Sequence, residues 1–243
     1  MSQEMKCNIK TCGRVDYSKS KFIQYDIELG RAFDVFSTSI NHALSQFERI
    51  NFDYNAVVGE LTNTSTTNPT TTQYEAQAIS ALDNSIVKFD HELGSALAAY
   101  ENMKHSLETL EAYIPYYKEL CGVCYIPGTL SPIVQLAKST HNALVTLNTS
   151  LRSTVNYNNS MQIDLNTFIY DISNTGTVIT VTKTAPNNTY SNLTNKYSNL
   201  STAASTVSID LSNLNSEFKA LRSALLKSGV LFDVCMKKCN DCC

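Results

Sequence analysis

Eight cysteines are the residues of this chain whose chemistry could define a site. Thiolates gathered in space can bind zinc, which prefers four soft ligands in a tetrahedron, or can oxidise to disulfides. Cys121-Gly-Val-Cys124 has the two-residue gap that is common in structural zinc sites. In chain order the groups are Cys7 and Cys12, then Cys121 and Cys124, then Cys235, Cys239, Cys242 and Cys243.

The sequence leaves three forms of cysteine chemistry open. An even number of cysteines favours disulfides, which should join different segments because pairs three or four residues apart on one helix fit disulfide geometry poorly. A reducing cytosol favours a metal instead, with Cys121, Cys124, Cys235 and Cys239 as ligands if zinc is bound. Reduced thiols could also pack as small apolar groups. Zinc is therefore the cofactor that these thiols could bind, and no motif in the sequence requires it.

The sequence contains no motif that indicates catalysis. The Cys121–Cys124 pair lacks the βαβ context of a thioredoxin-like redox site. There is no Glu-x-x-His pair of the kind that holds di-iron in helical bundles, no nucleophile elbow and no Gly-rich phosphate loop. The four histidines, at positions off the apolar series described below, are expected at the surface. We therefore expect a non-enzymatic protein without a small-molecule substrate.

Apolar residues recur at alternating steps of four and three along four segments. The series run from Leu29 to Leu61, from Ile79 to Tyr117, from Ile133 to Ile172 and from Leu193 to Leu225. This spacing places the apolar residues on one face of a helix, as in a coiled coil. The third series is the loosest, because it includes threonines and Asn158.

Polar stretches with Pro or Gly separate the four series, at 63–72, 125–132 and 174–188. Few Gly and Pro residues occur elsewhere, which favours long helices. The pattern predicts an all-α, elongated, up-down-up-down four-helix bundle with coiled-coil-like heptad packing. We expect a single helical-bundle domain over residues 1–243. Its helices are predicted at about 17–62, 73–121, 132–173 and 189–228.

An antiparallel path would bring the three cysteine-bearing segments, 7–12, 121–124 and 235–243, to one end of the bundle. Continuing the apolar series by fours and threes places most of these cysteines on the inward face, where thiols from different helices could meet. Two polar residues, Asp26 and Asn158, also fall on the inward face. Such residues can specify the register between helices, although Asp26 could instead be solvated near a helix end.

The composition of the chain narrows its expected binding partners and its expected site of synthesis. The net charge of −3 includes no basic excess, so nucleic acid is not expected as a partner. The N-terminal residues lack a signal-peptide core and no apolar stretch is long enough for a transmembrane segment, so synthesis in the cytosol is expected. Only 17% of the residues are charged, and helix faces this neutral favour contact with neighbouring proteins.

These features favour a structural or assembly protein, a strut or cement component of a larger particle such as a minor capsid protein of a virion. Its partners would be other proteins of a multi-subunit assembly. Two alternatives remain open. One is an intracellular zinc-capped coiled-coil adaptor; the other is a released pore-forming toxin or adhesin, whose membrane-active strip would be Val178–Val181.

Overall fold

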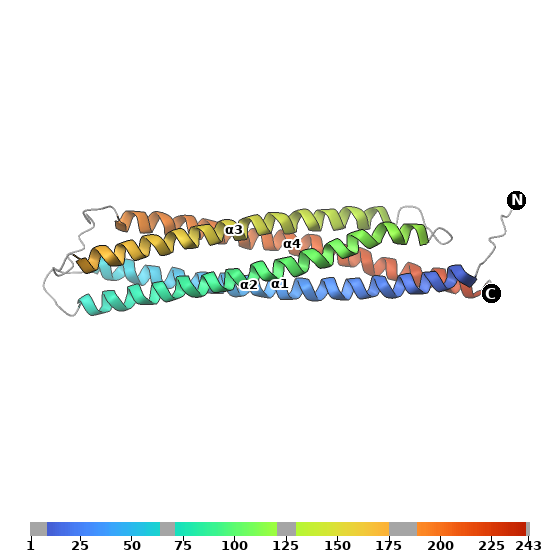
Figure 1. The fold of residues 1–243 in the computed structure, drawn as a ribbon, viewed down its shortest axis with the longest axis horizontal. Coiled ribbons are helices and arrows are strands. Elements are labelled where there is room, and N and C mark those ends of the chain that lie inside the picture. The colour runs from blue at the N-terminus through green and yellow to red at the C-terminus, as the bar shows by residue number, and fades with distance from the viewer. Residues whose placement is uncertain (1–8, 64–70, 121–129, 175–188, 242–243) are drawn as a thin grey trace. The chain divides into compact units, whose positions relative to one another are not determined.

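The computed structural model describes the backbone of residues 9–63, 71–120, 130–174 and 189–241 (Figure 1). Side chains are described over 20–60, with the exception of Phe22, and over 76–114, 132–170 and 191–227. The described residues form four helices and no strand: α1 (Ile9–Asn63), α2 (Thr71–Leu120), α3 (Leu130–Asn174) and α4 (Thr189–Asp241). The prediction of an all-helical fold with four helices is therefore confirmed.

The helix bounds agree with the predicted breaks but differ at two ends. α1 begins at Ile9, before the predicted start at 17, and α4 continues to Asp241, beyond the predicted end at 228. α4 therefore passes through Gly229, since one glycine costs a helix only about 1 kcal/mol relative to alanine. α3 begins two residues before Pro132, which suits the first turn of a helix because its backbone N there needs no intrahelical partner.

The four apolar series form the buried faces of the helices. Every described member of the first three series is buried, and the fourth series departs from this only at Tyr197 and Leu211, which are half-buried. The largest fully buried side chains include Phe36, Phe89 and Phe168. A spacing of four and three therefore predicted the core almost residue by residue.

Polar members of the third series are accommodated in two ways. Thr140 and Thr154, which are 0% and 1% exposed, each donate a hydrogen bond from the hydroxyl to the carbonyl four residues earlier in α3. This bond satisfies the hydroxyl within its own helix, so the threonines pack as small side chains. Asn158 is equally buried but is bonded to a different helix, as described below.

The chain forms two compact units, and each helix contributes a segment to both. Unit 1 comprises Met1–Phe36, Ala99–Thr146 and Ser212–Cys243, and unit 2 comprises Ser37–Ala98 and Leu147–Leu211. Within the part of the chain that the structure describes, no helix is long and apolar enough to cross a membrane.

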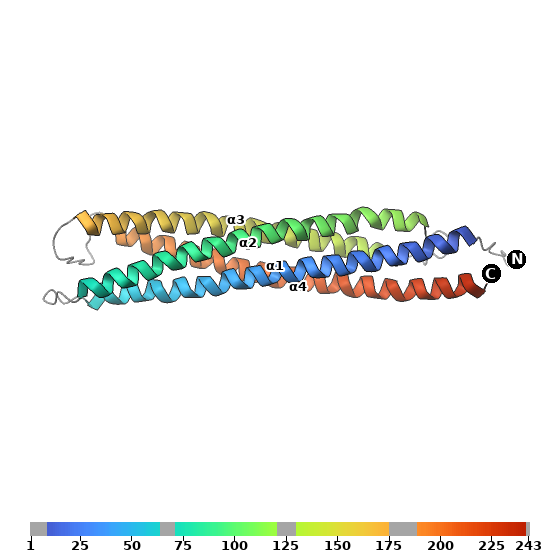
Figure 2. The ribbon, with the colours of Figure 1, turned by 60° about the horizontal axis from the view of Figure 1, so that its bottom comes forward.

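In unit 1, α1 packs between α2 and α4. Aromatic contacts join Tyr25 to Tyr113 and Phe36 to Tyr100, so that α2 numbers fall as α1 numbers rise and the two helices are antiparallel. On the other side of α1, Phe33 stacks on Phe218 of α4 with ring centroids 4.0 Å apart. Figure 2 shows these α1 and α4 segments side by side, as Figure 1 does.

Unit 2 repeats the antiparallel pairing with its own contacts. Phe47 of α1 lies against Phe89 of α2, and Tyr54 of α1 stacks on Tyr197 of α4. α2 also contacts α3, and α3 contacts α4, through the polar side chains described below. The helices are thus neighbours in chain order, with α4 returning to α1, as an up-down-up-down bundle requires.

Candidate functional site

The predicted cysteine cluster falls on residues whose side chains the structure does not describe. Cys12 lies within α1, and Cys235 and Cys239 lie within α4. Cys7, Cys121, Cys124, Cys242 and Cys243 lie outside the described residues, as does the Val178–Val181 strip. The helix ends beside the three cysteine groups, which are the start of α1, the end of α2 and the end of α4, all belong to unit 1. A shared cysteine site, by disulfide or zinc, remains a prediction.

A buried carboxylate joins α1 to α2 in unit 2. Asp53 is 3% exposed, and its Oδ2 accepts a hydrogen bond from the hydroxyl of Ser85, which is 4% exposed. The same oxygen lies 3.4 Å from Nε of Arg49, one turn earlier on α1. Arg49 in turn lies over the ring of Phe52, with its Cζ 5.1 Å from the ring centroid. A buried charge is tolerated here because a hydrogen bond and a cation compensate its lost hydration.

Replacing Ser85 with Ala tests this contact. The substitution removes the buried donor and leaves Asp53 with less compensation, so we expect the free energy of unfolding to fall by about 1–3 kcal/mol. Urea denaturation followed by circular dichroism would measure the change. Ser80→Ala, at an exposed position on the same helix, is the matched control and should change stability by less than about 0.5 kcal/mol. Equal effects of the two substitutions would show that the Asp53–Ser85 bond does not stabilise unit 2.

A second polar contact joins α2 to α3 in unit 2. Nδ2 of Asn158 donates a 3.3 Å hydrogen bond to the backbone carbonyl of Ile86, while its Oδ1 is buried with no hydrogen-bond partner in the described part of the structure. One turn away, the side-chain amide of Gln162 donates to Oδ1 of Asp83. Because both bonds need one particular alignment of α2 against α3, they favour a single register.

α4 is bonded to both of its neighbours in unit 2. Its Asp210 accepts a hydrogen bond from the hydroxyl of Ser150 on α3. Towards α1, the rings of Tyr54 and Tyr197 stack with centroids 3.8 Å apart, and Tyr54 donates to Oγ1 of Thr194 at 3.0 Å. Burial raises the pKa of Tyr197, and the neighbouring Tyr54 and Glu48 raise it further. The Tyr197 hydroxyl donates a hydrogen bond to Oδ1 of Asn51 on α1.

An ion pair joins α1 to α4 in unit 1. Nε and Nη2 of Arg222 lie 3.1 and 3.2 Å from the two carboxylate oxygens of Asp26, a bidentate arrangement. This hydrogen bonding raises the pKa of Arg222. Gly30 lies beside the guanidinium, and a Cβ there would be 3.3 Å from Cζ of Arg222, so glycine leaves room for the pair. Asp26 is thus partnered across helices, with a side chain that is 14% exposed.

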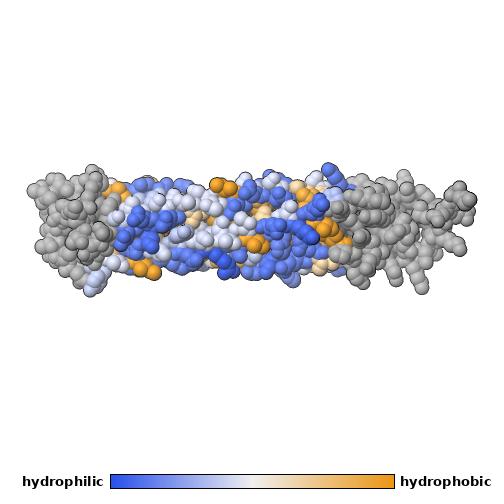
Figure 3. Space-filling model, turned by 90° about the horizontal axis from the view of Figure 1, so that it is seen from above, coloured by the Kyte–Doolittle hydropathy of each residue, from blue (hydrophilic) through white to orange (hydrophobic). Residues whose placement is uncertain are grey.

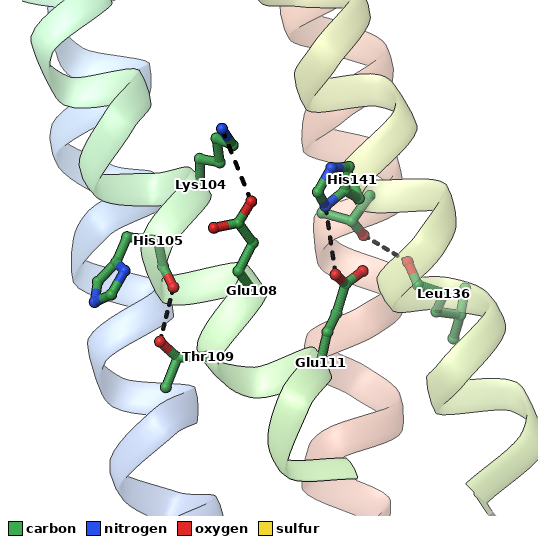
Figure 4. A network of polar contacts seen from close by, with 8 residues as sticks. Lys104, His105, Glu108, Thr109, Glu111, Leu136 and His141 are labelled. Carbon is green, nitrogen blue, oxygen red and sulfur yellow. Dashed lines mark hydrogen bonds and ion pairs between the residues drawn. The ribbon is translucent and has the colours of Figure 1, made fainter. Parts of the chain in front are cut away.

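A groove of about 520 Å³ lies between α2 and α3 in unit 1. Its apolar lining is Ile114, Val134 and Ala137. On its wall, Nδ1 of His141 lies 3.4 Å from Oε2 of Glu111 (Figure 4). The two side chains form an ion pair when the imidazole is protonated.

The other histidines are exposed, as expected, and Figure 4 shows His105 pointing away from this pair. The His141–Glu111 pair offers two groups that could bind a metal or transfer a proton. Over the residues with described side chains, however, no group of three or more His, Cys, Asp or Glu could hold a metal ion. The pair is a 3.4 Å contact between α2 and α3.

No family model, curated protein or solved structure matches this chain.

A second groove, of about 310 Å³, lies between α3 and α4 in unit 2. Most of its lining residues carry short hydroxyl side chains: Thr149, Ser150, Ser153, Thr202 and Thr206. Thr202 and Thr206 each donate their hydroxyl to the carbonyl four residues earlier in α4.

The same bond recurs at Ser95, Thr109, Thr167 and Ser205. Among the side chains coloured in Figure 3, most are hydrophilic or intermediate in hydropathy, and the hydrophobic ones are scattered.

Sequence reasoning missed several of these residues. Asp53 lies next to the apolar series but not on it, and a charged residue at such a position is usually solvated. Its burial depends on Ser85, which is also off the series. The available signal was the position of Asp26 and Asn158 on the inward face. The sequence left a role in register open for both, with solvation as the alternative for Asp26, and both form bonds between helices.

Proposed function

We propose that this chain is a non-enzymatic structural protein that acts as a strut or cement component of a larger protein assembly, such as a virus particle. The proposal rests on one observation: serine and threonine hydroxyls on the surface donate hydrogen bonds to backbone carbonyls of their own helix. A polar surface usually costs free energy when a partner covers it, because its donors lose their bonds to water. At these positions the donors are already bonded, so the cost of covering them is smaller.

The interior supports the same role. The apolar faces are buried along each helix, and polar bonds join each helix to its neighbours in unit 2. A bundle held this way keeps one register, which a spacer between other proteins needs. The adaptor and toxin alternatives rest on the cysteine side chains and on Val178–Val181, which lie outside the described part of the chain, so they gain no support here.

Sedimentation of extracts from the cells that make this protein tests the proposal. We expect the chain to sediment with other proteins in a fast fraction. Recovery of the whole chain at the size of a free monomer or small oligomer would contradict an assembly role.

We propose that the α3–α4 groove of unit 2, which is lined mostly by hydroxyl side chains, is one place where a partner binds, and a pair of variants tests it. Thr206→Arg places a long charged side chain in the α3–α4 groove, and Thr167→Arg makes the same change at another exposed threonine of unit 2 that bonds to its own helix. We expect Thr206→Arg to leave the fast fraction while Thr167→Arg remains in it. Circular dichroism must show equal helicity for both variants. Equal loss from the fast fraction would contradict a role for the groove.

A further inference from the structure

One side of unit 2 carries little charge. Its α3 and α4 segments, residues 147–174 and 189–211, contain five Asp, Glu, Lys or Arg residues among 51, whereas its α1 and α2 segments, 37–63 and 71–98, contain nine among 55. The difference is larger at the surface. Of the 19 exposed residues with described side chains on the α3 and α4 segments, only Arg152 is charged, whereas four of the 18 on the α1 and α2 segments are charged. We call the α3–α4 side of unit 2 the neutral face.

Large apolar side chains are exposed on the neutral face. Among the described side chains of unit 2, six large apolar ones are exposed, and only Phe52 and Val87 of these lie on α1 and α2. A partner that covers such side chains removes apolar surface from water, and on this face few charged groups would lose their hydration. The neutral face therefore favours contact with another protein surface. Its four exposed apolar residues are Tyr157, Ile163, Tyr170 and Ile209.

These four side chains form a row along the neutral face. Ile209 of α4 is next to the residue that accepts a hydrogen bond from Ser150, so it lies level with Ser150 of α3. From that level the row continues along α3 to Tyr157, Ile163 and Tyr170, in steps of about seven, six and seven residues. Each step is about 10 Å long and the row spans about 30 Å, at a rise of about 1.5 Å per residue. The order of the steps is the same from either end of the row.

We propose that the neutral faces of two copies of this chain pack against each other about a twofold axis. An axis across the middle of the row sets Tyr170 of one copy level with Ile209 of the other, and Ile163 level with Tyr157. Two helices, each about 10 Å wide, give a face of about 600 Å² over 30 Å, so the pair buries about 1,200 Å² in total. That area reaches the lower end of the range for specific interfaces. Twofold dimers are also the commonest oligomers of soluble proteins.

This inference rests on the proposed assembly function and deepens it, because it names the partner at the α3–α4 groove as a second copy of this chain. The groove lies on the neutral face, and Tyr157 of the apolar row is part of its lining. Pairing through this face leaves the α1–α2 side of unit 2, with its exposed charged residues, available to other proteins of the assembly.

The response of association to salt is the first test. Analytical ultracentrifugation of the purified full chain, with reductant present so that cysteines cannot cross-link copies, should show a proportion of dimer that rises with protein concentration. Raising the ionic strength from about 0.01 M to 1 M shortens the reach of Coulombic attraction from about 30 Å to 3 Å. Because the contact contains few charges, this change should not dissociate the dimer. A chain that is monomeric at every concentration, or a dimer that dissociates at high salt, would overturn the proposal.

Charged substitutions are the second test. Ile163→Glu with Tyr170→Glu would bury two carboxylates without partners in the contact, so we expect the dissociation constant of the dimer to rise about tenfold or more. Phe52→Glu with Val87→Glu is the matched control, since it places the same charge at exposed apolar residues of α1 and α2 and should leave the constant unchanged. Equal weakening by the two double variants would overturn the proposal.

A variant on the other helix separates a loss of contact from a loss of fold. Ile209→Glu changes α4 and leaves α3 intact, and it should also weaken the dimer while circular dichroism shows the helicity of the wild-type chain. A dimer as strong as that of the wild-type chain would contradict the proposed row of contacts.

The failure of this inference and the failure of the proposed function give different results. Purified chain that is monomeric but sediments with other proteins in extracts would refute the second copy and leave the assembly function standing. A purified dimer that is recovered from extracts at the size of a free dimer would support this inference and contradict the assembly function.

Discussion

Replacing Phe36 with Ala should lower the free energy of unfolding by about 3–5 kcal/mol. The Phe36 side chain has no exposed surface, and its ring lies 6.2 Å, centroid to centroid, from the ring of Tyr100 on α2. Truncation removes the buried ring and leaves a cavity between α1 and α2 that close-packed neighbours fill only in part. Urea denaturation followed by circular dichroism at increasing denaturant measures the loss.

Phe52→Ala is the matched control for this experiment. Phe52 lies on the same helix, but its side chain is 64% exposed and its close contact is the guanidinium of Arg49. Its removal should cost about 0.5–1 kcal/mol at most, the range for an exposed cation–π contact. Similar losses from the two substitutions would contradict the assignment of the Leu29–Leu61 series to the core.

Replacing Asn158 with Leu should raise the free energy of unfolding by about 1–2 kcal/mol. The substitution removes a buried carbonyl oxygen that has no hydrogen-bond partner among the described residues, and it adds apolar volume to the core. The bond to the carbonyl of Ile86 is lost, but that carbonyl keeps its partner within α2. Leucine branches at Cγ as asparagine does, so its side chain can follow the same path into the core.

Two further substitutions make the Asn158 prediction specific. Asn159→Leu makes the same change at the next, exposed position and should alter stability by less than about 0.5 kcal/mol. Asn158→Ala should destabilise, because it loses the hydrogen bond and leaves a cavity. A loss of stability with Asn158→Leu equal to that with Asn158→Ala would show that the amide stabilises the bundle, in addition to favouring one register.

If Asn158→Leu stabilises the bundle, then asparagine at this position contributes a single register between α2 and α3 and not stability. Helices packed only through apolar residues can shift in register at a small cost in free energy, because Leu and Ile residues of similar size occupy successive layers. The Asn158–Ile86 and Gln162–Asp83 bonds each require one alignment of α2 and α3. A strut needs defined positions for its surface residues, so a loss of stability in exchange for one register suits the proposed function.

The candidate sites could be predicted from sequence only in part. Asp26 and Asn158 stood out because they interrupt apolar series, and both form bonds between helices. Ser85, Ser150 and Arg222 gave no such signal, because serine and arginine at the edges of a helix are ordinary surface residues.

By itself, the sequence determined the four helices, the breaks between them and the buried face of each one. These properties are local, because a spacing of four and three places side chains on one face of a helix whatever surrounds it.

Only the tertiary structure decided which residues of different helices meet, such as Asp53 with Ser85 or Tyr54 with Tyr197. Those contacts depend on the register and rotation of one helix against another. Both arise from the packing of all four helices together, and the pattern along any single helix does not contain them.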